Sequence, residues 1–136
     1  MRRELSIGPR PYIIFPASIR KVKDVGFALL QLNRIIERYD LDVYVLGPII
    51  EQNYADVLLP QLDRVRYVGT VSHNRLLALL KNSVCLINTS ISEGMSNAIL
   101  EAQINRVLPV VRANDGNRHL VQHQQTGLLF DTAEQF

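Results

Sequence analysis

Short apolar runs recur along the chain and are separated by longer stretches of mixed polarity. Each run is continuously apolar rather than alternating, which is typical of strands buried on both faces of a parallel sheet. Pro109 lies near the start of the fifth run and indicates an edge or entry position, because proline lacks the N–H that a sheet interior requires. We expect strands over residues 12–15, 42–46, 65–68, 84–87, 107–111 and 127–130.

The stretches between these runs carry helix signals of unequal strength. Apolar residues at helical spacing predict a helix over residues 25–39. Ser72 is a good N-cap for a helix over 73–82, and either Ser96 or Asn97 caps the helix that follows the fourth strand. Weaker signals place helices over 54–62, where Pro60 interrupts, over 118–122, and from residue 131 onward.

Strands and helices alternate throughout, so we expect an α/β fold: a Rossmann-like parallel sheet of about six strands with helices on both faces. The length of 136 residues suits one domain. Residues 1–11 are basic and carry two prolines, so they form a lead-in or linker, and residues 12–136 form the domain. The last helix is not completed, which suggests a piece of a longer protein.

Composition narrows the range of partners. The net charge of +2 gives no general support to a nucleic acid or membrane partner. No apolar run approaches the roughly 20 residues of a membrane span, and no signal peptide opens the chain, so the expected location is cytoplasmic. Cys85 lies in an apolar strand and is expected to be a buried thiol.

The loop and helix after the fourth predicted strand are the main candidate site. Residues 92–102 read Ser-Glu-Gly-Met-Ser-Asn-Ala-Ile-Leu-Glu-Ala, a polar loop that runs into a helix. The free N–H groups of such a helix start suit a phosphate or another anion. Glu93 and Glu101 bracket this anion site, so their carboxylates are expected to contact other groups, such as sugar hydroxyls.

The loop after the first strand carries three cations in four positions, Arg20, Lys21 and Lys23. Such a cluster is often an ordinary solvated charge run. In Rossmann-like sheets, however, ligands bind at the carboxyl ends of the strands, where this loop lies. A fixed cation there stabilises the charge that a diphosphate leaving group gains. The sequence leaves open which of the three cations reaches the phosphate.

Other motifs favour structural roles. Asp40 and Asp42 lie at the turn and entry of a strand, at the wrong end of the sheet for this site, and His119 and His123 stand four residues apart without a third ligand near in sequence. We therefore expect no metal site. The Gly-x-Gly-x-x-Gly, Walker and Gly-x-Ser-x-Gly fingerprints are absent, which weighs against the common oxidoreductases, nucleoside triphosphatases and hydrolases.

The segment from Glu93 to Glu101 resembles the Glu, seven residues, Glu motif of retaining GT-B glycosyltransferases, the glycosyltransferase group 1 family. Residues 19–24 are similar to the family's basic loop, and the variant most similar is that of the glycosyltransferase-1-domain-containing proteins. The resemblance reaches from Tyr12 to the end of the chain. It continues in the family's order through residues 67–69, 76–80, 85–88, 109–111, 114–117 and 126–130.

This resemblance implies the carboxyl-terminal donor domain of a two-domain enzyme, one half of a GT-B fold. The enzyme would be of the hexosyltransferase type and would move a sugar from a nucleotide-diphosphate sugar to an unknown acceptor. It needs no cofactor and no metal. The acceptor site would lie in an amino-terminal domain that this chain lacks, so the chain alone is expected to bind the donor weakly and to transfer nothing.

The resemblance also assigns roles to residues. Arg20 and Lys23 would hold the diphosphate, and Glu93 the transferred sugar; these are the expected catalytic residues. Glu101 would bind the ribose hydroxyls, and the base would lie near residues 67–69. The expected donor-binding residues are Gly69, Gly94, Met95, Ser96, Asn97 and Glu101.

The chain departs from the family in three places. Arg20 and Lys23 are closer than the usual Arg, four residues, Lys, and Asp24 takes the place of a Gly. The stretch 103–108 is one residue longer than usual and lacks a Gly, and Asp115-Gly116 replaces a Gly pair. Two alternatives remain: another GT-B enzyme, such as an epimerase or phosphorylase, and a non-catalytic binding or interaction module.

Overall fold

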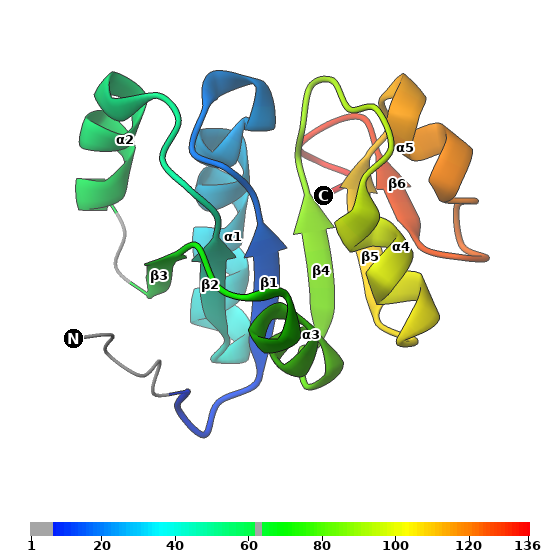
Figure 1. Ribbon diagram of the computed structural model, residues 1–136, viewed down its shortest axis with the longest axis horizontal. Helices are drawn as coiled ribbons and strands as arrows, with labels where there is room; N and C mark the ends of the chain where they lie inside the picture. The colour runs from blue at the N-terminus through cyan, green and yellow to red at the C-terminus, as the bar shows by residue number, and fades with distance from the viewer. Residues whose placement is uncertain (1–6, 62–63) are drawn as a thin grey trace.

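The computed structural model describes residues 7–61 and 64–136. Within these residues, six strands form one sheet in the order β3-β2-β1-β4-β5-β6, and all neighbouring strands are parallel (Figure 1). The predicted Rossmann-like sheet is therefore confirmed, and its strands begin and end within one residue of the expected positions. The strands are β1 (Tyr12–Pro16), β2 (Asp42–Leu46), β3 (Val65–Gly69), β4 (Cys85–Asn88), β5 (Leu108–Arg112) and β6 (Leu128–Phe130).

The helices agree less closely with the sequence pattern. The three strongest signals correspond to α1, α3 and α4, but the expected helix over 54–62 is wrong at both ends. It begins at residue 52, ends at 58 and passes into a 3-10 turn, and Leu62 lies outside the described residues. The elements are η1 (Lys21–Lys23), α1 (Val25–Tyr39), α2 (Gln52–Leu58), η2 (Leu59–Gln61), α3 (His73–Lys81), α4 (Asn97–Ile104) and α5 (Asp115–Leu120).

Two further helix predictions near the end of the chain need correction. The late helix was expected over 118–122 but begins at Asp115, because the side chain of Asn114 caps it by accepting a hydrogen bond from the Asn117 N–H at 2.8 Å. After Asp131 the chain forms a turn rather than a helix, closed by a hydrogen bond from the Phe136 N–H to the Thr132 carbonyl.

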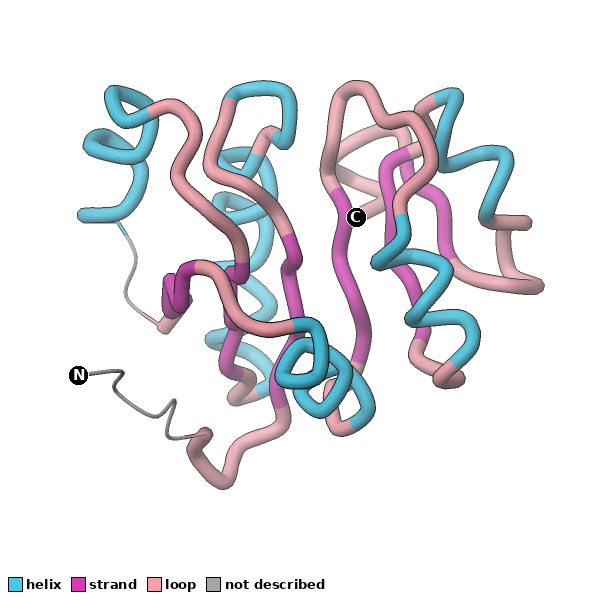
Figure 2. Tube along the Cα trace, viewed as in Figure 1, coloured by secondary structure: helices cyan, strands magenta, loops and turns pink. Residues whose placement is uncertain are grey.

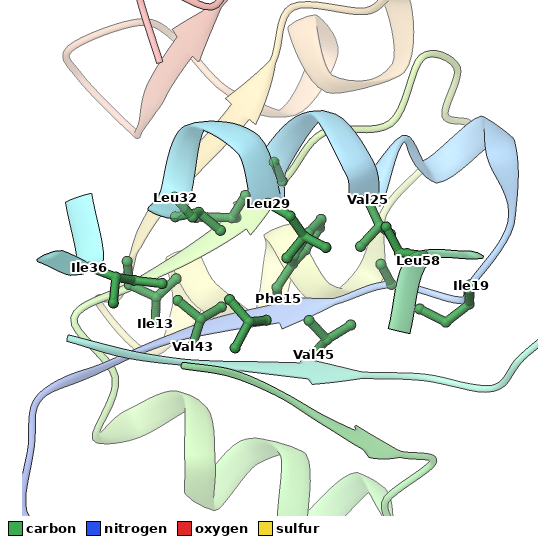
Figure 3. Close-up of a cluster of buried hydrophobic side chains, with 14 of the residues drawn as sticks. Ile13, Phe15, Ile19, Val25, Leu29, Leu32, Ile36, Val43, Val45 and Leu58 are labelled. Atoms are coloured by element: carbon green, nitrogen blue, oxygen red, sulfur yellow. The ribbon is translucent and has the colours of Figure 1, made fainter. Parts of the chain in front are cut away.

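Helix α1 covers one face of the sheet centre. Its buried side chains, such as Val25, Leu29 and Leu32, point onto the strand residues Phe15 and Val45 (Figure 3). This helix forms because its apolar residues recur at a spacing that keeps them on one side. Helix α2 adds Ala55 and Leu58 to the same cluster.

Helices α3, α4 and α5 cover the opposite face. Leu79 of α3 packs with Ile14 and Tyr44, and Ile99 of α4 packs with Leu86 and Val111. Helices on both faces explain why the strands read as continuous apolar runs. None of the described helices is long and apolar enough to cross a membrane.

The chain reverses direction across the sheet between β1 and β4. Strands β1, β2 and β3 run outward to one side, and the chain then returns to place β4 beside β1. The loops that follow β1 and β4 therefore lie next to each other at the carboxyl ends of the strands, at the top of Figure 2. In open parallel sheets this reversal point is where ligands bind.

The two ends of α4 are fixed by local hydrogen bonds. Ser96, rather than Asn97, is the N-cap, and its hydroxyl accepts a hydrogen bond from the Ile99 N–H. At the other end Arg106 has a positive φ of 59°, and the Val107 N–H donates to the Ala102 carbonyl at 2.8 Å. This is the left-handed helix ending that glycine usually makes, here made by an arginine.

The contrast between Leu30 and Leu32 tests the packing of α1. Leu32 is fully buried, whereas Leu30 is 65% exposed on the same helix. We expect Leu32→Ala to lower the free energy of unfolding by about 2–5 kcal/mol, because it removes buried atoms and leaves a cavity. Leu30→Ala is expected to change it by less than about 0.5 kcal/mol. Urea denaturation measures both, and equal losses would contradict this packing.

Candidate functional site

Two loops at the carboxyl ends of adjacent strands form the candidate site. We call residues 17–24, after β1, the basic loop, and residues 89–96, after β4, the Glu93 loop. Thr89 is fully buried, and its hydroxyl donates to the carbonyls of Lys23 and Asp24 at 2.9 and 3.1 Å. The Ile91 N–H donates to the Val22 carbonyl at 2.8 Å. The loops are thus joined through the backbone.

An ion pair between Lys23 and Glu93 joins the same loops through their side chains. Both side chains are largely buried, with exposed fractions of 17% and 12%. The Oε1 atom of Glu93 also accepts hydrogen bonds from Ser90 Oγ at 2.7 Å and from Asn88 Nδ2 at 3.4 Å. Within the described part of the chain, no group bonds the other oxygen, Oε2. One oxygen is therefore anchored, and the other is available to a ligand.

The surroundings of Glu93 keep its carboxylate ionised. Burial by itself raises the pKa of Glu93, but the hydrogen bonds from Lys23 and Ser90 and the charge of Lys23 more than offset it. The net result is a pKa below the ordinary value. A carboxylate of this kind accepts hydrogen bonds at neutral pH and has no proton to donate.

The three cations of the basic loop have different surroundings. Lys23 pairs with Glu93, and the side chain of Lys21 is exposed. Arg20 is half-buried, and its Nε is buried without a hydrogen-bond partner among the described residues. The turn itself is held by Glu51 at the start of α2, whose Oε1 accepts a hydrogen bond from the Lys21 N–H at 3.1 Å. Among the described cations of this loop, Arg20 is therefore the one with a buried N–H that has no hydrogen-bond partner.

Asp24 ends the basic loop in the left-handed conformation, with φ 47° and ψ 46°. Glycine adopts this conformation without steric cost, and an aspartate less easily. The Asp24 carboxylate pairs with Arg112 at 2.8 Å, and the Arg112 guanidinium lies 4.5 Å from the centre of the Phe27 ring. This link to the end of β5 could not be inferred from sequence, because the partners are 88 residues apart.

The backbone N–H groups from Gly94 to Ala98 form a row without hydrogen-bond partners among the described residues. No described residue accepts a hydrogen bond from the N–H groups of residues 94–98. Gly94, Met95 and Asn97 are exposed, and Ser96 is half-buried. The expected anion site at the start of α4 is therefore open to solvent and has unpaired N–H groups.

Glu101 and Gly69 lie away from this centre. Glu101 is on α4 with 22% of its side chain exposed, and the Nε2 atom of His73, at the start of α3, is 3.5 Å from its Oε1. Gly69 ends β3 with φ 86°. Since adjacent strands are about 4.8 Å apart, Gly69 lies ~14 Å across the sheet from β4. A ligand that contacts all these residues must be extended.

Sequence reasoning missed the polar groups that support the site. Asn88, Ser90, Asn114 and Asn117 are all buried. In the sequence, Asn114 and Asn117 stand out only as part of the stretch 114–117 of the family resemblance. Their positions depend on contacts between distant segments, which leave no local pattern.

Other polar groups play no part in this centre. Among the described residues there is no group of three His, Cys, Asp or Glu side chains that could hold a metal ion. His123 accepts a hydrogen bond from the Leu129 N–H through Nδ1. Burial raises the pKa of the Cys85 thiol to about 11, which makes it unreactive at neutral pH.

Comparison with known proteins adds a family to this geometry. The sequence profile of the family described as Glycosyl transferases group 1 matches residues 10–136. A protein from Xenopus tropicalis, Glycosyltransferase 1 domain-containing protein 1, is 33% identical over 123 residues. The alignment covers 87% of this chain and 35% of that protein.

Two solved structures share the fold. Anabaena Alr3699/HepE in complex with UDP-glucose superimposes with a TM-score of 0.80 at 19% identity, over 90% of this chain and 35% of that one. A glycosyltransferase from Rickettsia africae ESF-5 gives a TM-score of 0.81 at 20% identity, over 94% and 36% of the two chains. The chain spans about a third of the length of each of these relatives.

The left-handed backbone of Asp24 can be tested by two substitutions. Asp24→Gly and Asp24→Ala both remove the ion pair to Arg112, but only alanine keeps the steric cost of a positive φ. We expect the free energy of unfolding of the alanine variant to be about 1 kcal/mol lower than that of the glycine variant. Urea denaturation measures this difference. The control position is Asn33, which is exposed within α1. There the glycine variant should have a free energy of unfolding about 1 kcal/mol lower than the alanine variant, because glycine disfavours a helix.

The lowered pKa of Glu93 predicts a pH dependence of stability. Folding favours the ionised form of Glu93. The wild type should therefore have a higher free energy of unfolding than Glu93→Gln, and the difference should be largest above the ordinary pKa of 4.5. The excess should shrink as the pH falls through the folded-state pKa, where Glu93 becomes neutral. Urea denaturation from pH ~3 to ~7 covers this range. An excess that stays constant or grows toward acid would contradict the assignment.

Proposed function

The chain belongs to the group 1 family of glycosyl transferases, and on this premise we propose that its two joined loops bind the sugar donor of a retaining glycosyltransferase. The donor is a nucleotide-diphosphate sugar. The observation that carries the proposal is the Lys23–Glu93 ion pair, which places a cation and an anchored carboxylate beside unpaired backbone N–H groups at the sheet's reversal point.

The diphosphate is assigned to Arg20, Lys23 and the start of α4. Arg20 has an N–H group without a hydrogen-bond partner among the described residues. Lys23 has N–H groups beyond the one that bonds Glu93. The N–H groups of Gly94, Met95, Ser96 and Asn97 surround the distal phosphate. Fixed cations and helix N–H groups stabilise the charge that forms on the diphosphate when its bond to the sugar breaks. No metal is needed for this role.

The transferred sugar is assigned to Glu93. Its carboxylate is ionised and anchored through Oε1, so the free Oε2 can accept a hydrogen bond from a sugar hydroxyl. A group with this lowered pKa positions the sugar and is poorly suited to donate a proton. Glu93 thus orients the donor by hydrogen bonding, and no general acid is assigned to it.

The nucleoside is assigned to the more distant residues. Glu101 accepts hydrogen bonds from the ribose hydroxyls, and the base contacts the backbone around Gly69. The Tyr67 hydroxyl donates to the Gly47 carbonyl at 2.6 Å, and the Gly47 N–H donates to the Gly69 carbonyl at 2.9 Å, so the end of β3 beside the proposed base is held in place. The spacing of these residues suits an extended donor. Alr3699/HepE, with the same fold, is described in complex with UDP-glucose.

The acceptor is not assigned to any residue of this chain. We propose that it is bound by an amino-terminal domain, across a cleft from the donor, as in two-domain enzymes that transfer hexoses. The expected behaviour of the 136 residues alone is weak donor binding without transfer.

Binding to a panel of nucleoside diphosphates and their sugars tests this function. We expect one nucleotide of the panel, which includes UDP and UDP-glucose, to shift NMR signals of the chain saturably. Glu101→Ala should weaken this binding about tenfold or more, because it removes hydrogen bonds to a charged group.

The control is Glu37→Ala, which removes an exposed carboxylate from α1 and should leave the affinity unchanged. A folded sample that responds to no member of the panel would refute donor binding. It would favour a non-catalytic module instead.

A further inference from the structure

The first turn of α5 contacts the Glu93 loop at two points. The Asn114 side chain donates to the Ser90 carbonyl at 2.9 Å. A side chain at Gly116 would place its Cβ 2.0 Å from the Glu93 carbonyl oxygen and 2.2 Å from that of Gly94, so only glycine allows this approach. Asn117, in the same turn, contacts Asn88 at the end of β4, immediately before the loop. Helix α5 therefore fixes the backbone of the loop that carries Glu93.

Asn117 is fully buried, and its side chain contacts Asn88, one of the residues that donate hydrogen bonds to Glu93. Its Nδ2 donates to Asn88 Oδ1 at 3.2 Å and to the Arg112 carbonyl at 3.0 Å. Its Oδ1 has no hydrogen-bond partner among the described residues. The Asn117 amide therefore pairs two acceptors, and one of them belongs to a residue that bonds Glu93.

Asn88 passes the effect of Asn117 to Glu93. Its Oδ1 accepts hydrogen bonds from the Ser90 N–H and from Asn117 Nδ2. These two donors fix the orientation of the amide, because the opposite orientation would place Nδ2 against them. The Asn88 Nδ2 must then point toward Glu93, where it donates to Oε1 at 3.4 Å.

We propose that Asn117 is a positioning residue that acts through Asn88 on Glu93, and so selects for the sugar half of the donor. This inference rests on the proposed function. With Oε1 held by Asn88, Ser90 and Lys23, Oε2 is presented to a sugar hydroxyl in one place. Asn117 touches neither the diphosphate nor the nucleoside. Its loss should weaken contacts to the sugar and leave contacts to the nucleotide intact.

The test compares the affinities of UDP and UDP-glucose for the 136-residue chain by NMR titration. Asn117→Leu removes the amide and keeps the branched shape of the side chain. It should weaken UDP-glucose binding about fivefold, the effect of one lost hydrogen bond, and change UDP binding by less than about twofold. Asn88→Leu should give the same loss, and the double variant no further loss, because both act through one carboxylate.

Arg118→Ala is the control. Arg118 is exposed in the same helix and pairs with Asp131 at 3.3 Å, so both affinities should stay unchanged. If Asn117→Leu does not fold, as judged by circular dichroism, Asn117→Ala takes its place. It removes the same N–H groups and should likewise weaken UDP-glucose binding more than UDP binding.

The outcomes separate the two proposals. Wild type that binds both ligands, with variants that weaken both equally or neither, overturns the role of Asn117 and leaves donor binding standing. Wild type that binds neither ligand nor any other panel member overturns the proposed function, and this inference with it.

Discussion

The ion pair between Lys23 and Glu93 is the constraint on which the site depends. Its partners are 70 residues apart and meet because the chain reverses direction between β1 and β4. Removing two charges from water costs several kcal/mol per ion, and the pair recovers this only with additional hydrogen bonds. Ser90 and Asn88 supply such bonds to the carboxylate. A buried pair is weak support for stability, but it holds two loops and two charges in one arrangement.

The surrounding polar groups serve that arrangement more than they serve the core. Thr89, Asn88 and Asn117 occupy positions where apolar side chains would bury surface without needing partners. Each uses its hydrogen bonds to join the basic loop, the Glu93 loop or α5. A site fixed in this way is arranged before the ligand arrives, so binding costs less ordering of side chains. Among the described residues, the backbone N–H groups of residues 94–98 remain unpaired at the exposed start of α4, and they are the groups that the proposed phosphate would contact.

Most of the fold could be predicted from the sequence because local patterns determine it. Apolar runs set the strands, helical spacing set α1, and Ser96 marked the start of α4. Helix α5 was misplaced because residues such as Asn114 and Gly116 suit turns and helix N-caps alike. The contact of His73 with Glu101, and that of Asp24 with Arg112, could not be predicted, since pairing between distant segments leaves no periodic signal.

The departures from the family pattern become consistent once backbone geometry is considered. Asp24 takes the place of a glycine in the family resemblance, Arg106 lies in the stretch that lacks the expected glycine, and both take a positive φ, of 47° and 59°. That conformation costs a side chain only about 1–2 kcal/mol, which an ion pair or a helix-ending hydrogen bond offsets. At Gly116 the carbonyl of Glu93 leaves no room for any Cβ, and glycine is present. A missing glycine is therefore strong evidence against a family-like loop only where a Cβ would collide with neighbouring atoms. Where the position requires only a positive φ, its absence is much weaker evidence. At Asp24 the basic loop thus has a positive φ without a glycine, and at Gly116 the glycine leaves room for the Glu93 carbonyl.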